Sequence, residues 1–349
     1  MNTEPSPTAT APGRTSASTS LVASDTMRAI VQDRYGDVDT LRMEQTERPT
    51  IASDEVLVRV HAAGMDRGTW HTMTGRPYLM RIMGFGFRGP KNRVPGLDVA
   101  GTVVEVGTSV TRFAVGDEVF GISRGSFAEY AAAREDKLAA KPQSLTFEQA
   151  AVVPVSGITA LQALRDAGRL QAGQRVLIIG ASGGVGSYAV QIAKALGAHV
   201  TGVASTSKLD LLKTLGADDV IDYTCEDFAE GPDRYDLIID IGGNSTLTRL
   251  RRALTAHGTL VIVGGENGGS VTGGIGRQLR ALAISPFLPQ RLTMHATKER
   301  ASDLEPLIDL IETGRVTPSL ERTYSLDQVP AAIRQLQAGT VRGKLAVTL

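Results

Sequence analysis

The sequence has one cysteine, no net charge and no long apolar run, and each of these features excludes a class of structure or of binding partner. Cys225 alone cannot form an intrachain disulfide or a cysteine-rich zinc site, and we expect the protein in the reducing cytoplasm. Lys and Arg number 37, as do Asp and Glu, so no general electrostatic attraction to nucleic acid or anionic membranes is expected. The apolar runs, such as 176–179, are too short to span a bilayer, so they suit buried strands.

The first 26 residues lack a periodic apolar face and consist mostly of Thr, Ser, Ala and Pro. Such a segment cannot bury enough surface to offset the entropy of ordering it. A basic start followed by an apolar core, as in a signal peptide, is also missing. We therefore predict a disordered tail over residues 1–26.

The remainder is long enough for two domains. Short strands are expected from residue 27 to 150, at 55–60, 99–106 and 127–130, with a turn that leads into another short strand at 116–121, which is typical of an irregular β-barrel. From 151 to 296 strands alternate with helices, which predicts a parallel sheet covered on both faces. Residues 297–349 hold two helices and a final strand that we expect to return to the first domain. The predicted fold class is α/β, a β-rich domain plus a doubly wound sheet.

A glycine-rich turn, Gly180-Ala-Ser-Gly-Gly-Val-Gly186, follows an apolar strand and opens an amphipathic helix. This is the context that a dinucleotide fingerprint requires. Gly183 and Gly184 let the backbone approach a pyrophosphate, Gly186 allows tight packing of helix on strand, and the helix N-terminus presents N–H groups to phosphate. The alternative is a plain tight turn.

The next strand favours NADP over NAD. An NAD site usually has an acid at its end, about 20 residues after the first glycine, to hold the ribose hydroxyl. Here the strand leads into Ser205-Thr206-Ser207-Lys208, and no acid precedes Asp210. Hydroxyls and an ammonium suit a 2′-phosphate. The Ser-Thr-Ser run could also simply cap the following helix.

Five motifs in this order resemble one known family, the zinc-free, quinone oxidoreductase-like branch of the medium-chain dehydrogenase/reductase superfamily. The resemblance covers nearly all of residues 27–349. The motifs are VPGLDVAG at 94–101, GDEVFG at 116–121, GSFAEY at 125–130, VPVSGITA at 153–160 and the glycine turn at 180–186.

The resemblance implies a GroES-like catalytic domain, a Rossmann domain and NADPH bound between them. It places Lys208 and Tyr223 beside the adenosine phosphate, although Tyr223 could equally be a half-buried strand tyrosine. It places Thr159 near the nicotinamide, together with Gly264 and Gly265. The cofactor residues expected from motif and resemblance together are Thr159, Ser182, Gly183, Gly184, Val185, Gly186, Ser205, Ser207, Lys208, Tyr223, Gly264 and Gly265.

Relatives that depend on zinc hold it at places that here resemble Gly64, Leu97 and Val155. None of these side chains can bind zinc, so we expect no metal. Without a Lewis acid to activate an alcohol, the resemblance favours hydride delivery to an electron-poor acceptor.

The resemblance also suggests catalytic residues. Asp66 could hold the nicotinamide ribose or orient water, or it could be a turn-capping carboxylate. Trp70 could stack on a flat acceptor, or belong to the core. Tyr78 could supply a proton. For His71 we favour an ordinary surface histidine, and for Lys344 a cap of the last strand.

The function expected is an NADPH-dependent reduction of a quinone or an α,β-unsaturated carbonyl, a small-molecule substrate. Alternatives are a zinc-free alcohol or aldehyde dehydrogenase and a non-catalytic NADPH-binding protein. Residues 291–296 resemble the family's edge strand, whose unpaired backbone groups favour a homodimer. A monomer with that edge covered by the chain after Thr297 is the other reading.

Overall fold

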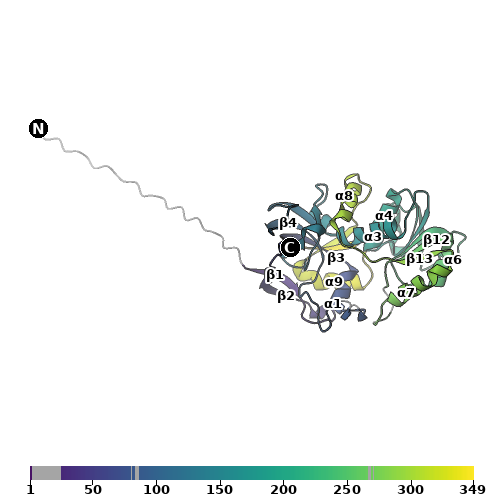
Figure 1. Cartoon of the computed structure of the whole chain (residues 1–349), viewed down its shortest axis with the longest axis horizontal. Coiled ribbons are helices and arrows are strands. Elements are labelled where there is room, and N and C mark those ends of the chain that lie inside the picture. Colours follow the sequence, from purple (N-terminus) through teal and green to yellow (C-terminus); the bar gives the residue numbers. More distant parts are fainter. Residues whose placement is uncertain (2–24, 80, 83–85, 266–268, 270) are drawn as a thin grey trace.

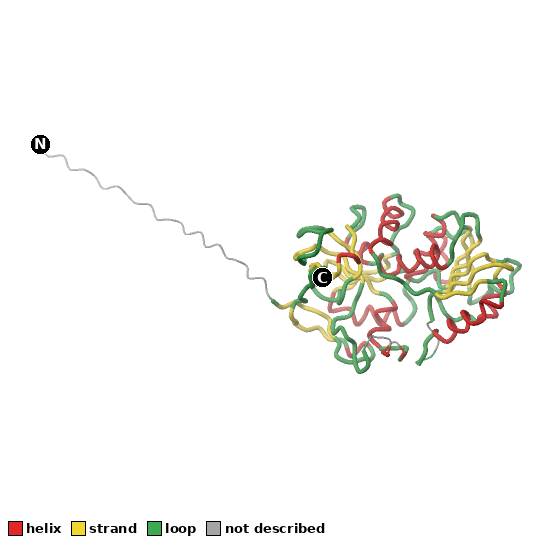
Figure 2. Tube along the Cα trace, viewed as in Figure 1, coloured by secondary structure: helices red, strands yellow, loops and turns green. Residues whose placement is uncertain are grey.

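The computed structural model describes residues 1, 25–79, 81–82, 86–265, 269 and 271–349, so most of the tail expected at 1–26 lies outside the described residues. Two lobes, each built around a β-sheet, lie side by side with helices between and around them (Figure 1). Figure 2 shows the strands gathered in two separate groups, one in each lobe. The α/β fold class expected from the sequence is confirmed.

The second lobe contains a six-stranded parallel sheet in the order β10-β9-β8-β11-β12-β13. Its central strands are short runs of Val, Ile and Leu that are buried on both faces, as a sheet covered by helices requires. The strand order reverses between β8 and β11, and ligands of such sheets bind at this switch point, beyond the carboxyl ends of the strands. The elements are β8 (Arg175–Ile179), α4 (Gly184–Ala195), β9 (His199–Ala204), α5 (Leu209–Thr214), β10 (Asp219–Asp222), β11 (Tyr235–Asp240), α6 (Leu247–Ala253), β12 (Leu254–Ile262), α7 (Ile275–Ile284) and β13 (Arg291–Met294).

The first lobe is built around the long strand β3, which pairs antiparallel with β4, β6 and β15. Register shifts in the β3–β4 pairing bend this sheet into the irregular shape of a partial barrel. Its elements are β1 (Thr26–Val31), β2 (Arg42–Glu47), β3 (Glu55–Met65), α1 (Arg67–Thr74), β4 (Asp98–Val106), β5 (Glu118–Ile122), β6 (Tyr130–Arg134), β7 (Leu138–Ala140) and α2 (Phe147–Ala151).

The end of the chain joins this first sheet. β14 and β15 are parallel to each other, and β15 continues the sheet beside β3. Lys344, the first residue of β15, is thereby brought next to residues almost 250 positions earlier in the chain. The connecting elements are α3 (Pro154–Gln162), α8 (Leu304–Glu312), β14 (Leu320–Ser325), α9 (Val329–Gln337) and β15 (Lys344–Thr348).

The strand expected at 127–130 is wrong, because regular pairing begins only at Tyr130. Phe127 is completely buried, and its backbone is hydrogen-bonded to Ile30 of β1 and to Pro95 instead of to a strand of the larger sheet. Ala128 makes an isolated antiparallel bridge to Ala29, also in β1. The segment therefore runs beside β1 before it enters the larger sheet.

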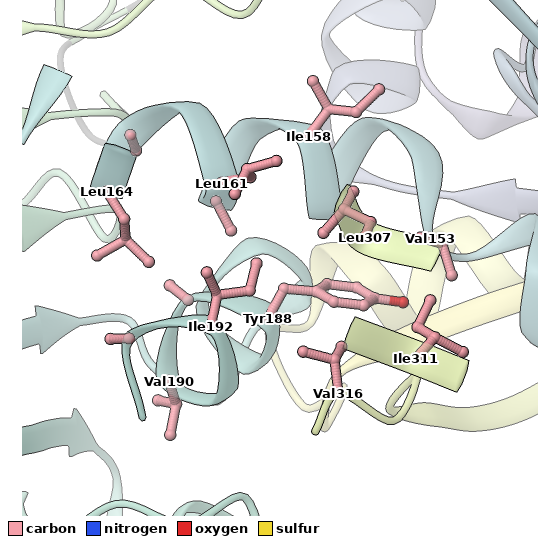
Figure 3. Packing of buried hydrophobic residues seen from close by; sticks show 14 of the residues in the cluster. Val153, Ile158, Leu161, Leu164, Tyr188, Val190, Ile192, Leu307, Ile311 and Val316 are labelled. Atoms are coloured by element: carbon pink, nitrogen blue, oxygen red, sulfur yellow. The ribbon is translucent and has the colours of Figure 1, made fainter. Parts of the chain in front are cut away.

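One hydrophobic core cluster connects the lobes, since it runs from the first sheet through α3 and α4 to the parallel sheet. Tyr188 of α4 lies at its centre between Val153 and the α8 residues Leu307 and Ile311 (Figure 3). Its ring is fully buried, and its hydroxyl donates to the carbonyl of Val152 at 3.1 Å. This bond joins the first helix of the Rossmann sheet to the chain that leaves the first lobe.

We predict that Tyr188→Phe lowers the free energy of unfolding by about 1 kcal/mol, because the ring stays packed while a buried hydrogen bond is lost. Denaturant unfolding would measure the change. The matched control is Tyr223→Phe, whose ring is 59% exposed and which should leave stability unchanged. Equal stability of the two variants would contradict this role of Tyr188.

Candidate functional site

The turn between β8 and α4 is shaped by two glycines that cannot be replaced without movement. Gly180 has a φ of 83°, which side chains disfavour. A Cβ on Gly186 would overlap the carbonyl oxygen of Gly180 and lie 2.7 Å from Ala181 Cα. Helix α4 can therefore start this close to the end of its strand only because both positions lack a side chain.

The start of α4 is suited to bind an anion. Its N-cap residue, Gly183, offers no side chain to the first helical N–H groups, and the helix is twelve residues long. Such a terminus presents unpaired N–H donors and a partial positive charge. A Cβ on Gly183 would touch only the Gly180 carbonyl at 3.5 Å, so its backbone is approachable from outside. These features fit the pyrophosphate of a dinucleotide.

A cleft of about 500 Å³ opens beside this turn, at the carboxyl ends of β8 and β9. Six of the expected cofactor residues line it: Ser182, Gly183, Gly184, Ser205, Lys208 and Tyr223. Its other walls were not expected from the sequence, and they come from α1, from the chain after β10 and after β11, and from the C-terminal segment. They include Arg67, Phe228, Asn244, Ser245, Arg249, Leu336, Gly339, Val341 and Gly343.

Lys208 lies at one end of the cleft and is fixed by the C-terminal segment. Its Nζ donates to the carbonyls of Gly339 at 2.7 Å and Val341 at 2.8 Å. An ammonium has three N–H donors, so one remains for a phosphate oxygen. Burial lowers the pKa of Lys208, Glu321 raises it and Arg342 lowers it.

The acids near this end are already engaged. β9 ends at Ala204, where an NAD site would carry a carboxylate. Asp210 is bonded to Arg342 at 2.6 Å. Asp222 accepts from the hydroxyls of Thr206 and Thr224, and these bonds lower its pKa. The residues that face the cleft here are Ser205, Lys208 and the exposed Tyr223.

The other expected cofactor residues do not line this cleft: Thr159, Val185, Gly186, Ser207, Gly264 and Gly265. Gly186 has the packing role described above, and Ser207 is exposed. Thr159 is bonded to Val155 O at 2.6 Å and to the hydroxyl of Thr297 at 2.8 Å. Thr159 therefore links α3 to the chain after β13.

Gly264 and Gly265 belong to a tightly packed turn after β12, held by a buried ion pair that the sequence did not reveal. Asp240, at the end of β11, is fully buried and pairs with Arg277 of α7. Arg277 also donates to the carbonyls of Ser245 at 2.9 Å and Gly264 at 3.1 Å. Burial raises the pKa of Asp240, and Arg277 opposes this rise. The pair fixes the loops after β11 and β12 at the cleft.

The two carboxylate oxygens of Asp66 have different surroundings. Its Oδ1 caps α1 by accepting from Thr69 N at 3.0 Å, so the turn-capping reading is right for that oxygen. Its Oδ2 is buried without a hydrogen-bond partner among the described residues, 3.9 Å from Lys344 Nζ. One carboxylate oxygen thus caps the helix, and the other is available to accept a hydrogen bond.

Trp70 and Tyr78 line a separate cavity of about 310 Å³, together with Tyr35 and Arg81. The Trp70 ring is half-buried against the first-lobe core, and its Nε1 has no partner among the described residues. Tyr78 is 40% exposed, and the guanidinium of Arg81 lies over its ring. The next residue, Leu79, donates to Val271 O at 3.1 Å, so this loop contacts the second lobe.

Lys344 is not a surface cap of the last strand, and that expectation was wrong. It is 2% exposed, and its Nζ donates to Asp98 Oδ2 at 3.2 Å. Asp98 is completely buried and also accepts from Val155 N at 2.8 Å. Burial raises the pKa of Asp98 to about 7, with Lys344 lowering it and Asp66 raising it.

The Asp98 carboxylate occupies the space where Gly64 lacks a side chain. A Cβ on Gly64 would lie 2.9 Å from Asp98 Oδ2 and would overlap the carbonyl of Ala151. Gly64 and the backbone of Val155 therefore surround Asp98, and Leu97 precedes it in the chain. Among the described residues no group of three or more His, Cys, Asp or Glu side chains could hold a metal ion.

Residues 52–143 match the alcohol dehydrogenase GroES-like domain, and residues 215–347 match the family named zinc-binding dehydrogenase. A 2-methylene-furan-3-one reductase of Solanum lycopersicum is 33% identical over 95% of this chain and 81% of its own length. The chain belongs to the quinone oxidoreductase-like branch of the medium-chain dehydrogenase/reductase superfamily.

Two further relatives of this oxidoreductase bear on the cofactor. The mitochondrial NAD(P)H oxidoreductase RTN4IP1 of Mus musculus is 33% identical and covers 95% of this chain and 91% of its own. The quinone oxidoreductase structure from Coxiella burnetii has a TM-score of 0.82 at 29% identity, over 93% of this chain and 99% of that one. An oxidoreductase with a nicotinamide cofactor is therefore supported.

Within the described residues, no helix is both long and apolar enough to cross a membrane.

We predict that Gly186→Ala and Gly183→Ala separate folding from cofactor binding. The Cβ at 186 overlaps backbone that cannot move aside, so this variant should unfold at a clearly lower temperature. The Cβ at 183 makes only an ordinary contact, so that variant should keep its melting temperature but bind dinucleotide more weakly. Thermal melts and fluorescence titration would test both, and full dinucleotide affinity in Gly183→Ala would exclude a close backbone approach there.

Proposed function

We propose that this oxidoreductase uses NADPH to reduce a quinone or an α,β-unsaturated carbonyl without a metal. The observation that carries the proposal is the end of the cleft at β9, where Lys208, Ser205 and Tyr223 gather and no carboxylate of the described residues lines the site. A 2′-phosphate finds a cation and a hydroxyl there. An NAD ribose would lack its usual acidic partner.

The names of similar proteins agree with this proposal. A mycobacterial protein solved in complex with NADPH has a TM-score of 0.79 at 26% identity, over 93% of this chain and all of that one. The tomato relative is named as a reductase of a methylene-furanone. The absence of metal rests on Gly64, Leu97 and Val155, none of which offers a lone pair for a zinc ion.

When bound, the dinucleotide supplies the hydride. The residues of this chain then have to exclude water, hold the acceptor and deliver one proton. We assign stacking of a flat acceptor to Trp70 and the proton to the Tyr78 hydroxyl, which is exposed enough to be reprotonated from solvent. We assign to Asp66 Oδ2 the acceptance of a hydroxyl hydrogen from a bound molecule, since that oxygen lacks a partner among the described residues.

The decisive experiment measures NADPH oxidation with a small quinone and with a simple enone, before and after exhaustive chelation. Unchanged turnover after chelation, with no stoichiometric zinc by mass spectrometry, is the expected result. Activity that disappears with removal of bound zinc would refute the metal-free proposal. Tight NADPH binding with no turnover of either acceptor would instead favour a non-catalytic binding protein.

We predict that NADPH binds at least tenfold more tightly than NADH, because one charge-assisted hydrogen bond contributes on the order of 1.5–3 kcal/mol. Lys208→Ala should reduce this preference and leave NADH affinity nearly unchanged. The control is Lys213→Ala, a basic residue of the neighbouring helix outside the cleft lining. Fluorescence titration would measure all affinities, and equal wild-type affinities would end the idea.

We also propose a homodimer and a cytoplasmic location. β13 is an edge strand of the parallel sheet, and Leu279, Leu282 and Phe287 are exposed on α7 and just after it. The chain after Thr297 turns away to α3, where Lys298 and Gln162 are hydrogen-bonded.

For the location, the single cysteine fits a reducing compartment, although some relatives carry mitochondrial or chloroplast names.

We predict that Phe287→Glu weakens the dimer, since it places a charge on the apolar surface beside β13. The matched control is Phe87→Glu in the first lobe, because the two rings are 85% and 75% exposed. Sedimentation at micromolar concentration would measure assembly. The variant Thr293→Pro would be a less informative test of the dimer. His295 N donates to Ile262 O of β12, and every second N–H of a strand points to the same side, so the Thr293 N–H also points toward β12. A monomeric wild type would refute the dimer.

A further inference from the structure

Three charged side chains, Asp66, Asp98 and Lys344, are buried together at the junction of the lobes. The side chains of Lys344 and Asp98 are 1% and 0% exposed, and that of Asp66 is 10% exposed. With all three ionised the cluster has one negative charge in excess. Buried charges are costly unless paired and fully hydrogen-bonded, so this composition needs an explanation.

The cluster is incompletely satisfied. Lys344 donates one hydrogen bond, of 3.2 Å, to Asp98, whereas Asp66 Oδ2 is 3.9 Å away, beyond hydrogen-bond distance. Asp66 Oδ2 and the hydroxyl of Ser156 are buried without hydrogen-bond partners among the described residues. Most buried polar atoms in proteins have a partner, so these atoms mark a place where a bound molecule or water completes the network.

This place adjoins the glycine turn. A Cβ built on Gly184, the first residue of α4, would lie 2.8 Å from Lys344 Cδ and 3.2 Å from Ser156 Oγ. Gly343, just before Lys344, lines the cleft and donates its N–H to Ser182 O at 2.8 Å. The charge of the cluster is therefore adjacent to the N–H groups that we propose to bind the phosphates of a dinucleotide.

We propose that Lys344 and Asp98 set the affinity of the glycine turn for the dinucleotide phosphates. Lys344 is a buried cation that attracts them, and Asp98 is a carboxylate that repels them when ionised. Both are positioning residues, since they act on the turn from behind. The proposal rests on the proposed function only through the cofactor, because it concerns binding and not the acceptor.

The direction of the effect follows from the groups that face Asp98. These are Lys344 of β15, Asp66 before α1, the N–H of Val155 in α3 and Tyr188 of α4. Burial raises the pKa of Asp98 to about 7, and burial together with Asp98 raises that of Tyr188, which stays neutral. Below pH 7 Asp98 is mostly protonated, and as the pH rises above 7 its ionisation adds one negative charge to the cluster. Affinity for phosphates should therefore fall as the pH rises through 7.

The test is a fluorescence titration of the full chain with NADH and with NADPH from pH 6 to 8.5. NADH is the primary probe, since the second pKa of a phosphate monoester such as the 2′-phosphate is about 6 and would itself titrate. We expect the wild-type Kd for NADH to rise about three- to tenfold over this range, the order expected for one added charge at partly screened distance. Asp98→Asn should keep the tight, low-pH affinity at every pH.

Lys344→Met should weaken NADH binding about tenfold at pH 6. Its control is Lys141→Met, because Lys141 is also buried beside a carboxylate, Glu118, but lies outside the cleft lining. If Lys344→Met does not fold, the double variant with Asp98→Asn removes both charges of the pair and is measured in its place. That double variant should fold and bind NADH without pH dependence.

This inference would be overturned, and the proposed function left intact, if the wild-type affinity for NADH did not change with pH. The same holds if Asp98→Asn showed the same pH dependence as the wild type. Failure of both dinucleotides to bind at any pH would remove the proposed function, and the inference with it.

Discussion

The buried contact between Lys344 and Asp98 joins four elements that are far apart in the chain, β15, β4, α3 and α4. Lys344 begins the last strand and Asp98 begins β4, while Asp98 also accepts from the backbone of α3, and the stem of Lys344 packs on the start of α4. Removing one partner of such a buried pair typically costs about 3–5 kcal/mol, because the other charge is left uncompensated. The Lys344 ammonium therefore adds to the core cluster a second, polar connection between the first sheet and the glycine turn.

Much of the fold could be predicted from the sequence because it depends on residue patterns within short segments of the chain. The apolar runs at β8, β11 and β12, the glycine turn and the amphipathic α4 each carry their own signal. The strand predicted at 127–130 was placed too early, because Phe127 is a residue type that favours strands but is buried here by contacts with β1 and with Pro95. Composition does not reveal which distant backbone a segment will meet, so the start of that strand could not be placed.

The residues of the candidate site likewise divide into those that the sequence reveals and those that it does not. The glycines of the turn, Ser205 and Lys208 could be found because they adjoin a recognisable motif. Asp98, Asp240 and Arg277 could not, because their importance comes from burial beside partners far along the chain. Lys344 was misjudged for the same reason, since a lysine at a strand start is ordinarily solvated. An available signal was Asp98 itself, a charged residue among small and apolar neighbours at the start of a buried strand.

The C-terminal segment gives the two ends of the phosphate site a common support. Carbonyls of Gly339 and Val341 hold Lys208, the N–H of Gly343 holds Ser182, and the next residue is Lys344. Six consecutive residues therefore position the cation proposed for the 2′-phosphate and the one beside the pyrophosphate turn. The end that the resemblance assigns to the nicotinamide depends instead on Asp240 and Arg277, which fix the loops after β11 and β12. Changes that loosen the C-terminal segment should thus affect which dinucleotide binds, whereas changes at the Asp240–Arg277 pair should affect how its reactive end is presented.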